Sequence, residues 1–187
     1  MGSGGKEGIG GIYERWSGKA AEQIVPLSAH GSGRKYYRIS DDGNTVIGVY
    51  NGDRKENVAF LTFSWYFREH GLPVPEIYME DLENGLYLQQ DLGDETLYAK
   101  LTAITGEEGF SDRLIGMYRQ VIDYLPRFQI TAGKDLDYSV CYPRDRFDEQ
   151  SIRWDLNYFK YYFLKFTDIT FDEQALEYDF SRFTAFL

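Results

Sequence analysis

The stretch that decides the fold is Ser28-Ala-His-Gly-Ser-Gly-Arg-Lys-Tyr-Tyr-Arg-Ile39, which carries small residues and two glycines in its first half. An apolar run, Ile24-Val-Pro-Leu27, precedes it, and its own end, Lys35-Tyr-Tyr-Arg-Ile39, is β-prone. A strand, a tight loop and a returning strand are therefore predicted across residues 24–39.

The loop between these strands has the composition of an anion-binding turn. Gly31 and Gly33 would let the backbone take positive φ and approach a ligand closely. Ser32 adds a hydroxyl, the exposed N–H groups could bind an anion, and Arg34 and Lys35 follow where they could meet a phosphate. An ordinary hairpin with a basic exit explains the same residues, because short glycine motifs are common.

Composition restricts the class of protein. The chain has 187 residues, enough for one domain or one domain plus part of another, and 16 Tyr and 13 Phe argue against disorder. A net charge of −10 makes nucleic acid or an anionic membrane a poor general partner, and no apolar run approaches the length of a membrane span. The one cysteine, Cys141, fits a reducing compartment, so we expect a cytoplasmic protein.

The residues after the second strand continue an α+β pattern. Asp41-Asp-Gly-Asn44 is a strong turn signal, and an apolar-rich helical pattern over 56–70 ends at Gly71. Further strands are predicted at 45–50, 77–79 and 86–90. We therefore expect one antiparallel sheet of five strands with one helix packed on it.

The two ends of the chain differ in character. Met1 to Gly10 is read as a flexible leader, followed by a short helix at 12–16. Beyond Gly93 the pattern becomes helical, and Ser111 can cap a helix. Phe147-Asp-Glu-Gln150 recurs as Phe171-Asp-Glu-Gln174, and we read the two copies as helix starts capped by aspartate, not as an internal repeat.

Three stretches resemble the small lobe of protein-kinase-like phosphotransferases, and within them the aminoglycoside phosphotransferase and small-molecule kinase branch. They are the loop Gly31–Arg38, the helix-ending break His70–Pro75, and the strand and hinge Gly85–Asp94. Within that branch the chain looks most like bacterial kinases of amino sugars used in cell-wall recycling. The resemblance implies a leader and short helix over 1–19, a small lobe over 20–93, and an incomplete helical large lobe over 94–187.

This resemblance implies a nucleotide site that takes ATP. Ser32, Gly33, Arg34 and Lys35 would lie over the phosphates. Glu56 would steady a phosphate-binding cation, although it could equally favour the N-terminus of its own helix. The hinge would bind adenine through backbone groups of Gln90, Asp91 and Leu92. The alternatives are that Leu92 belongs to the core, and that Asp91 and Asp94 are turn residues.

The third strand departs from the family pattern because it lacks the usual lysine, and Gly48 stands in its place. Lys35 or Arg38 from the neighbouring strand could substitute. Side chains alternate along a strand, so only one of the two can face the cleft. We expect it to be Lys35.

A larger departure concerns catalysis. The family's His-x-Asp loop and its later metal-binding residues position the acceptor hydroxyl and hold Mg²⁺. This chain has only His30 and His70, and neither is followed by such an aspartate, so we identify no catalytic residue and expect the Mg²⁺ ligands outside the chain. We expect a fragment that is inactive by itself and self-associates through exposed helical faces.

The leading functional hypothesis is thus part of an ATP-dependent kinase that phosphorylates a hydroxyl of a sugar or amino sugar. A second hypothesis is a non-catalytic nucleotide-binding or interaction module with a degenerate kinase-like fold. A third is an α+β domain that binds no nucleotide.

Overall fold

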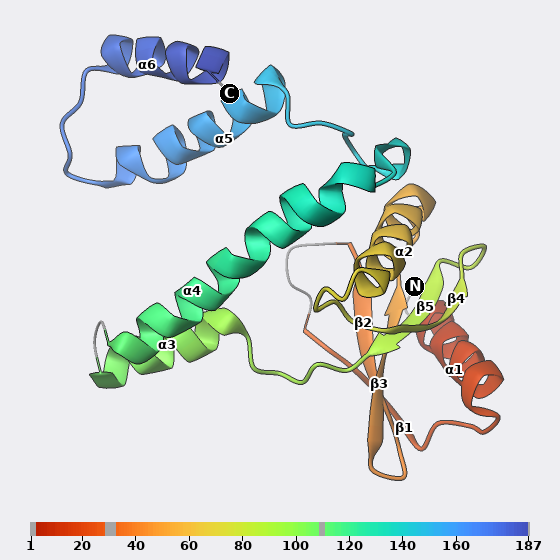
Figure 1. The fold of residues 1–187 in the computed structure, drawn as a ribbon. Helices are drawn as coiled ribbons and strands as arrows, with labels where there is room; N and C mark the ends of the chain where they lie inside the picture. The colour runs from red at the N-terminus through yellow and green to blue at the C-terminus, as the bar shows by residue number, and fades with distance from the viewer. Residues whose placement is uncertain (1–2, 29–32, 109–110, 187) are drawn as a thin grey trace. The chain divides into compact units, whose positions relative to one another are not determined.

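The computed structural model describes residues 3–28, 33–108 and 111–186, and its architecture is α+β (Figure 1). The chain forms two compact units, residues 1–142 and 143–187. No helix within the described ranges is both long enough and apolar enough to cross a membrane.

The first unit is built on one five-stranded antiparallel sheet in the order β1-β2-β3-β5-β4, as predicted. Its strands are β1 (Gln23–Pro26), β2 (Lys35–Asp41), β3 (Asn44–Tyr50), β4 (Ile77–Asp81) and β5 (Leu86–Gln90). Asp42 and Gly43 both have positive φ between β2 and β3, as a two-residue hairpin turn requires. This turn fixes the register in which Tyr37 lies opposite Gly48.

Helix α2 (Arg54–Glu69) covers one face of the sheet, as predicted. Asp53 caps its first turn by accepting the backbone N–H groups of Lys55 and Glu56. Gly71 ends it with a φ of +67°, and the N–H of Leu72 reaches back to the carbonyl of Phe67 in the pattern typical of a glycine C-cap. The core beneath α2 consists of Ile47, Val49, Leu61 and Tyr87.

Helix α1 (Ser3–Ser17) covers the opposite face, so the interpretation of residues up to Gly10 as a flexible leader is wrong for the described part of that segment. Ile9 and Ile12 are fully buried against the sheet. Glycines form poor helices in isolation, but here they permit close approach: a Cβ at Gly8 would stand 3.0 Å from Leu86 Cδ1. The helix exists because the second apolar face of the sheet needs cover.

After β5 the first unit is mainly helical. The first helix of this part, α3, was not predicted. It contains α3 (Leu97–Glu108), α4 (Asp112–Pro126), the π-helical turn η1 (Arg127–Ala132), and the short 3₁₀ turns η2 (Gly133–Asp135) and η3 (Tyr138–Val140). Ser111 caps α4 as expected, by accepting the N–H of Leu114. The residues between β5 and α3, 91–96, are called the connector below.

The second unit contains two helices, α5 (Glu149–Tyr162) and α6 (Glu173–Phe186), with the 3₁₀ turn η4 (Leu164–Phe166) between them. Asp148 and Asp172 accept backbone N–H groups in the first turns of α5 and α6, so the repeated motif does mark two helix starts. Lys160 is buried on α5 and forms ion pairs with Glu173 and Glu177 of α6.

Candidate functional site

A hollow of about 560 Å³ lies where the glycine-bearing loop leaves the sheet. It is lined by Leu27, Ser28, Tyr36, Gly93, Asp94 and Thr96. β1 and β2 are joined here, because the N–H of Leu27 donates to the carbonyl of Tyr36. The hollow therefore has one wall from the first two strands and another from the connector.

Beside this hollow, Arg34 and Glu56 form an ion pair with 3.1 Å between Nη2 and Oε1. The guanidinium also lies 4.9 Å from the centre of the Phe60 ring and hydrogen-bonds the side chain of Tyr36, which lines the hollow. The other oxygen of Glu56 accepts a 2.7 Å hydrogen bond from Asn51 Nδ2. The glutamate of α2 thus does hold a cation, and that cation comes from the exit of the loop.

The surroundings keep Arg34 charged. Burial lowers its pKa, but Tyr87, Tyr36 and Glu56 outweigh this effect and the net pKa is raised. Tyr87 lies beneath α2 and its own pKa is raised by burial. A half-buried guanidinium next to an open hollow is suited to binding an anion.

The expected orientation of Lys35 and Arg38 is reversed. Lys35 lies over the ring of Tyr50, which packs with the core under α1. Arg38 is on the opposite face, across from Ile47, and it binds carboxylates of the connector. Neither side chain pairs with Glu56, whose ion-pair partner is Arg34.

Gly48 cannot mark the place of a cleft-facing lysine, because a side chain there would point toward α1. A Cβ on Gly48 would stand 2.7 Å from Ile9 Cγ2 and 3.2 Å from Ile39 Cδ1. The residues of β3 that face α2 are its neighbours Ile47 and Val49. The strand therefore contributes no cation on the α2 face, and Gly48 serves the packing of α1.

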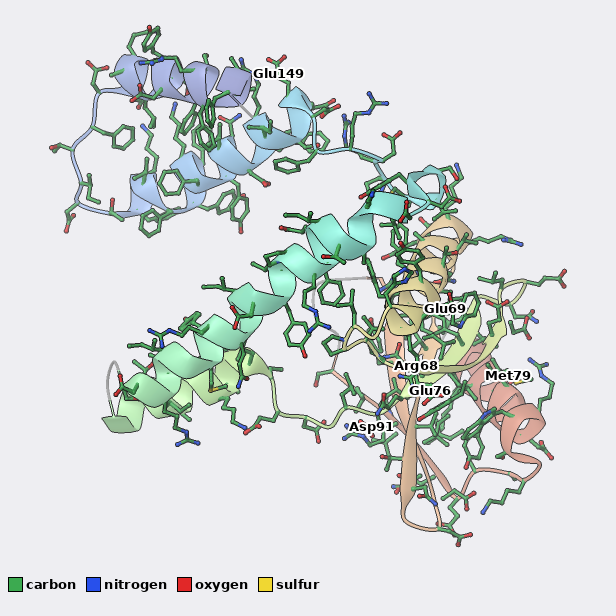
Figure 2. The ribbon with its side chains drawn as sticks, in the orientation of Figure 1. Arg68, Glu69, Glu76, Met79, Asp91 and Glu149 are labelled. Atoms are coloured by element: carbon green, nitrogen blue, oxygen red, sulfur yellow. The ribbon has the colours of Figure 1, made fainter. Side chains whose placement is uncertain are left out.

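The three predicted hinge residues differ in their surroundings. The N–H of Gln90 already donates to the carbonyl of Glu76, and its side-chain oxygen accepts the N–H of Glu76. Leu92 is 67% exposed, which rules out the core alternative for it. Asp91, at the point where the chain leaves β5 (Figure 2), has a nearly buried carboxylate paired with Arg38. Asp91 also accepts the N–H of Gly93, so it is a turn residue as well.

The loop is only partly described. His30, Gly31 and Ser32 lie outside the described residues. At Gly33, no atom of the described residues lies within 4 Å of the place a Cβ would take. His70 is a helix-end residue, with Nδ1 2.7 Å from the carbonyl oxygen of Tyr66.

None of the six residues that line the hollow was among the predicted nucleotide-binding residues, and Leu27 and Tyr36 were treated only as parts of strands. The alternation of side chains along β2 could have indicated which face of the strand Tyr36 takes. Because Tyr37 and Ile39 pack toward α1, Tyr36 must face the other way, toward the connector side.

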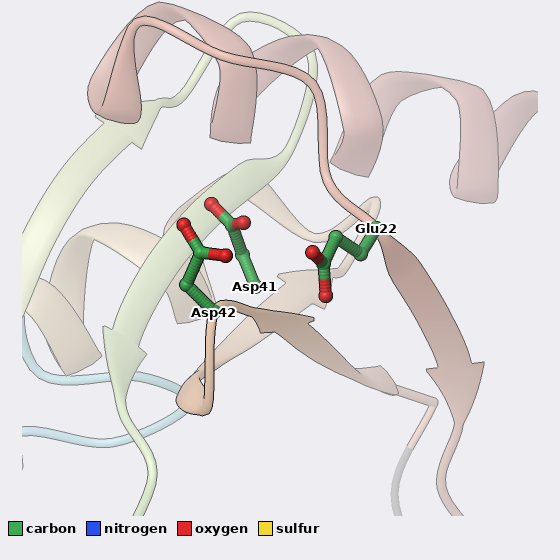
Figure 3. A group of neighbouring side chains, drawn as sticks. All are labelled: Glu22, Asp41 and Asp42. Atoms are coloured by element: carbon green, nitrogen blue, oxygen red, sulfur yellow. The ribbon is translucent and has the colours of Figure 1, made fainter.

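The described part of the chain does not offer a Mg²⁺ site at the hollow. Glu56 is paired with Arg34, and Asp91 and Asp94 are both paired with Arg38. Glu22, Asp41 and Asp42 do bring their carboxylates together at the far end of β2 (Figure 3). There Lys19 binds two of them, at 2.7 Å from Asp41 and 2.8 Å from Asp42, so the cluster has its own cation.

Comparison with known proteins supports a relationship to sugar kinases, a class of phosphotransferase. No protein-family model matches the chain. It is 27% identical over 104 residues to the N-acetylmuramate/N-acetylglucosamine kinase of Pseudomonas aeruginosa, and this match covers 55% of this chain and 31% of that protein. It is 27% identical over 115 residues to the protein of the same name from Pseudomonas putida, covering 61% and 32%. The chain thus matches about a third of the length of these curated relatives.

Proposed function

We propose that this chain provides the nucleotide-binding part of an ATP-dependent kinase that phosphorylates a hydroxyl of an amino sugar. The observation that carries the proposal is the Arg34–Glu56 ion pair beside a hollow bounded by two strands and the connector. The similarity to two amino-sugar kinases supports the same class of activity.

In this proposal the hollow takes the base and ribose of ATP. Leu27 and Tyr36 offer apolar and aromatic surface for the base, and backbone groups of the connector offer hydrogen bonds. Arg34 supplies positive charge for the phosphates, and Glu56 fixes the direction of its guanidinium. Loss of such a charge-assisted contact costs about 1.5–3 kcal/mol, or about ten- to a hundredfold in affinity.

Mg²⁺ would neutralise charge developing on the phosphates during transfer. The carboxylates near the hollow are held by arginines, so the proposal assigns the metal ligands and the group that positions the acceptor hydroxyl to a further segment. The pairing of Glu56, Asp91 and Asp94 with arginines also favours a second candidate, a nucleotide-binding module without catalysis.

Isothermal titration of the chain with ATP tests the first step. The wild type should bind, and Arg34→Gln should weaken binding about ten- to a hundredfold. Arg15→Gln is the matched control, because Arg15 pairs with Asp81 on the α1 side of the sheet. Equal ATP affinity in wild type and Arg34→Gln would refute the assigned role of Arg34, and no binding by wild type would refute the nucleotide site.

Turnover distinguishes the two candidates. ADP release is measured with N-acetylglucosamine and N-acetylmuramate as acceptors, using the longest natural polypeptide that contains this sequence. Acceptor-dependent release supports the kinase. ATP binding without release supports the non-catalytic module.

A further inference from the structure

One guanidinium in the first unit holds two carboxylates of the connector. Arg38 Nε lies 2.6 Å from Asp91 Oδ2 and Nη2 lies 3.0 Å from Asp91 Oδ1, a bidentate pair. The same guanidinium reaches Asp94, with 2.9 Å between Nη1 and Oδ2 and 2.8 Å between Nη2 and Oδ1. The Asp91 side chain is 6% exposed, so this pair is shielded from solvent far better than an ordinary surface salt bridge.

The contacts of Arg38 join the two segments that line the hollow, the connector and β2. Asp91 Oδ1 also accepts the N–H of Gly93 at 2.9 Å, and Gly93 has a φ of +82° that suits glycine. Gly93 and Asp94 line the hollow from the connector. From β2 it is lined by Tyr36, which lies two residues before Arg38 and so on the same face of the strand.

Charge argues against Arg38 as a phosphate ligand. Each of its three nitrogens is engaged by a carboxylate, and the group carries two negative charges for one positive charge. A nucleotide phosphate would be repelled by this arrangement, whose net charge is negative. Removing Arg38 would leave the nearly buried carboxylate of Asp91 without its cationic partner, which is costly.

We propose that Arg38 is a positioning residue that ties the connector to β2 and so holds together the two walls of the hollow. This inference rests on the proposed nucleotide site and assigns Arg38 to its base and ribose end. Losing the tie should weaken nucleoside binding, because the connector must then be ordered when the ligand binds.

The experiment compares adenosine with ATP as calorimetric ligands of the whole chain. Arg38→Gln should weaken both by a similar factor of about ten, while Arg34→Gln should weaken ATP and leave adenosine unchanged. Arg38→Lys keeps the charge but loses the bidentate geometry, so it should restore only part of the affinity. Arg68→Gln removes an exposed ion pair with Glu76 at the other end of α2 and should change neither affinity.

Amide hydrogen exchange provides a readout that needs no ligand. Arg38→Gln should speed exchange in residues 91–96 and leave exchange in α1 unchanged. If Arg38→Gln fails to fold, Asp94→Asn can replace it, because it removes one of the two carboxylates that Arg38 binds and its side chain is 80% exposed. This variant should also speed exchange in residues 91–96, but by less.

Unchanged affinity for both ligands, a loss confined to ATP, or unchanged exchange in the connector would each overturn the positioning role. If wild type binds neither adenosine nor ATP, the proposed nucleotide site fails, and connector exchange then decides independently whether Arg38 orders this segment.

Discussion

Arg34 and Glu56 meet across 3.1 Å, and this ion pair joins the exit of the glycine-bearing loop to the first turn of α2. The two residues are brought together by the fold, because the whole of β2 and β3 separates them in sequence. Glu56 is held in turn by Asn51, which is buried. The position of Arg34, the candidate phosphate cation, therefore depends on how α2 starts.

Glu56→Gln should weaken ATP binding about three- to tenfold and leave adenosine binding unchanged. The substitution removes the charge that orients Arg34 but keeps a hydrogen-bonding group next to Asn51. Glu69→Gln, at the opposite end of α2 (Figure 2), is the matched control. Equal losses for ATP and adenosine would mean that Glu56 supports the whole unit and not Arg34 in particular.

Gly48→Ala should lower the free energy of unfolding by about 1–3 kcal/mol, since the new methyl group would overlap Ile9 Cγ2 at 2.7 Å. Urea denaturation measures this change. The new methyl group of Gly116→Ala in α4 meets no atom of the described residues within 4 Å, so this substitution should stabilise the chain by up to about 1 kcal/mol. A neutral effect at Gly48 would contradict the close packing of α1 on β3.

Asp41 should make folding stability depend on pH in the acid range. The Lys19 ammonium lowers the pKa of this carboxyl, with help from the Tyr13 hydroxyl at 3.0 Å. A pKa lower in the folded than in the unfolded state adds stability above about pH 4, and this stability is lost as the pH falls through the folded pKa. Asp41→Asn should therefore flatten the acid limb of stability against pH.

The control for this titration is Asp42→Asn, because the Asp42 side chain is 73% exposed and should influence the acid limb less. An acid limb that is identical in wild type and Asp41→Asn would contradict the assignment. Stability at each pH is taken from urea denaturation followed by circular dichroism.

Self-association through the second unit remains a prediction. α5 exposes a row of stacked aromatic rings, Tyr158 on Tyr162 and Phe159 on Phe163, that lines an apolar hollow of about 380 Å³. Exposed apolar patches of this kind favour association with another copy. Sedimentation should show a mass that rises with concentration, and Tyr162→Gln with Phe163→Gln should reduce this rise. Tyr98→Gln, a 79% exposed residue of α3, is the control.

The local elements of the first unit could be predicted because their signals are local. Alternating apolar residues marked the strands, Asp42-Gly43 marked the hairpin turn, and Gly71 marked the end of α2. The caps Ser111, Asp148 and Asp172 were equally readable, since a side-chain oxygen near its own helix start needs no distant partner. α3 was missed although it carries a cap of the same kind, since the Thr96 hydroxyl accepts the N–H of Ala99 at 3.1 Å.

The site depended on tertiary structure to a greater degree. Sequence alternation determined that Lys35 and Arg38 lie on opposite faces of β2, but it did not say which face each would take. That choice followed from the packing of α1, whose glycine-rich sequence has little helix propensity and gains its order from the sheet beneath it. With α1 on one face of the sheet, Lys35 lies over the Tyr50 ring on that face. Arg38 lies on the other face and pairs with Asp91 of the connector, and Arg34 pairs with Glu56. The sequence by itself determined the strands, their turns and the cationic residues near the loop, whereas the burial of two opposite sheet faces decided the partner of each cation.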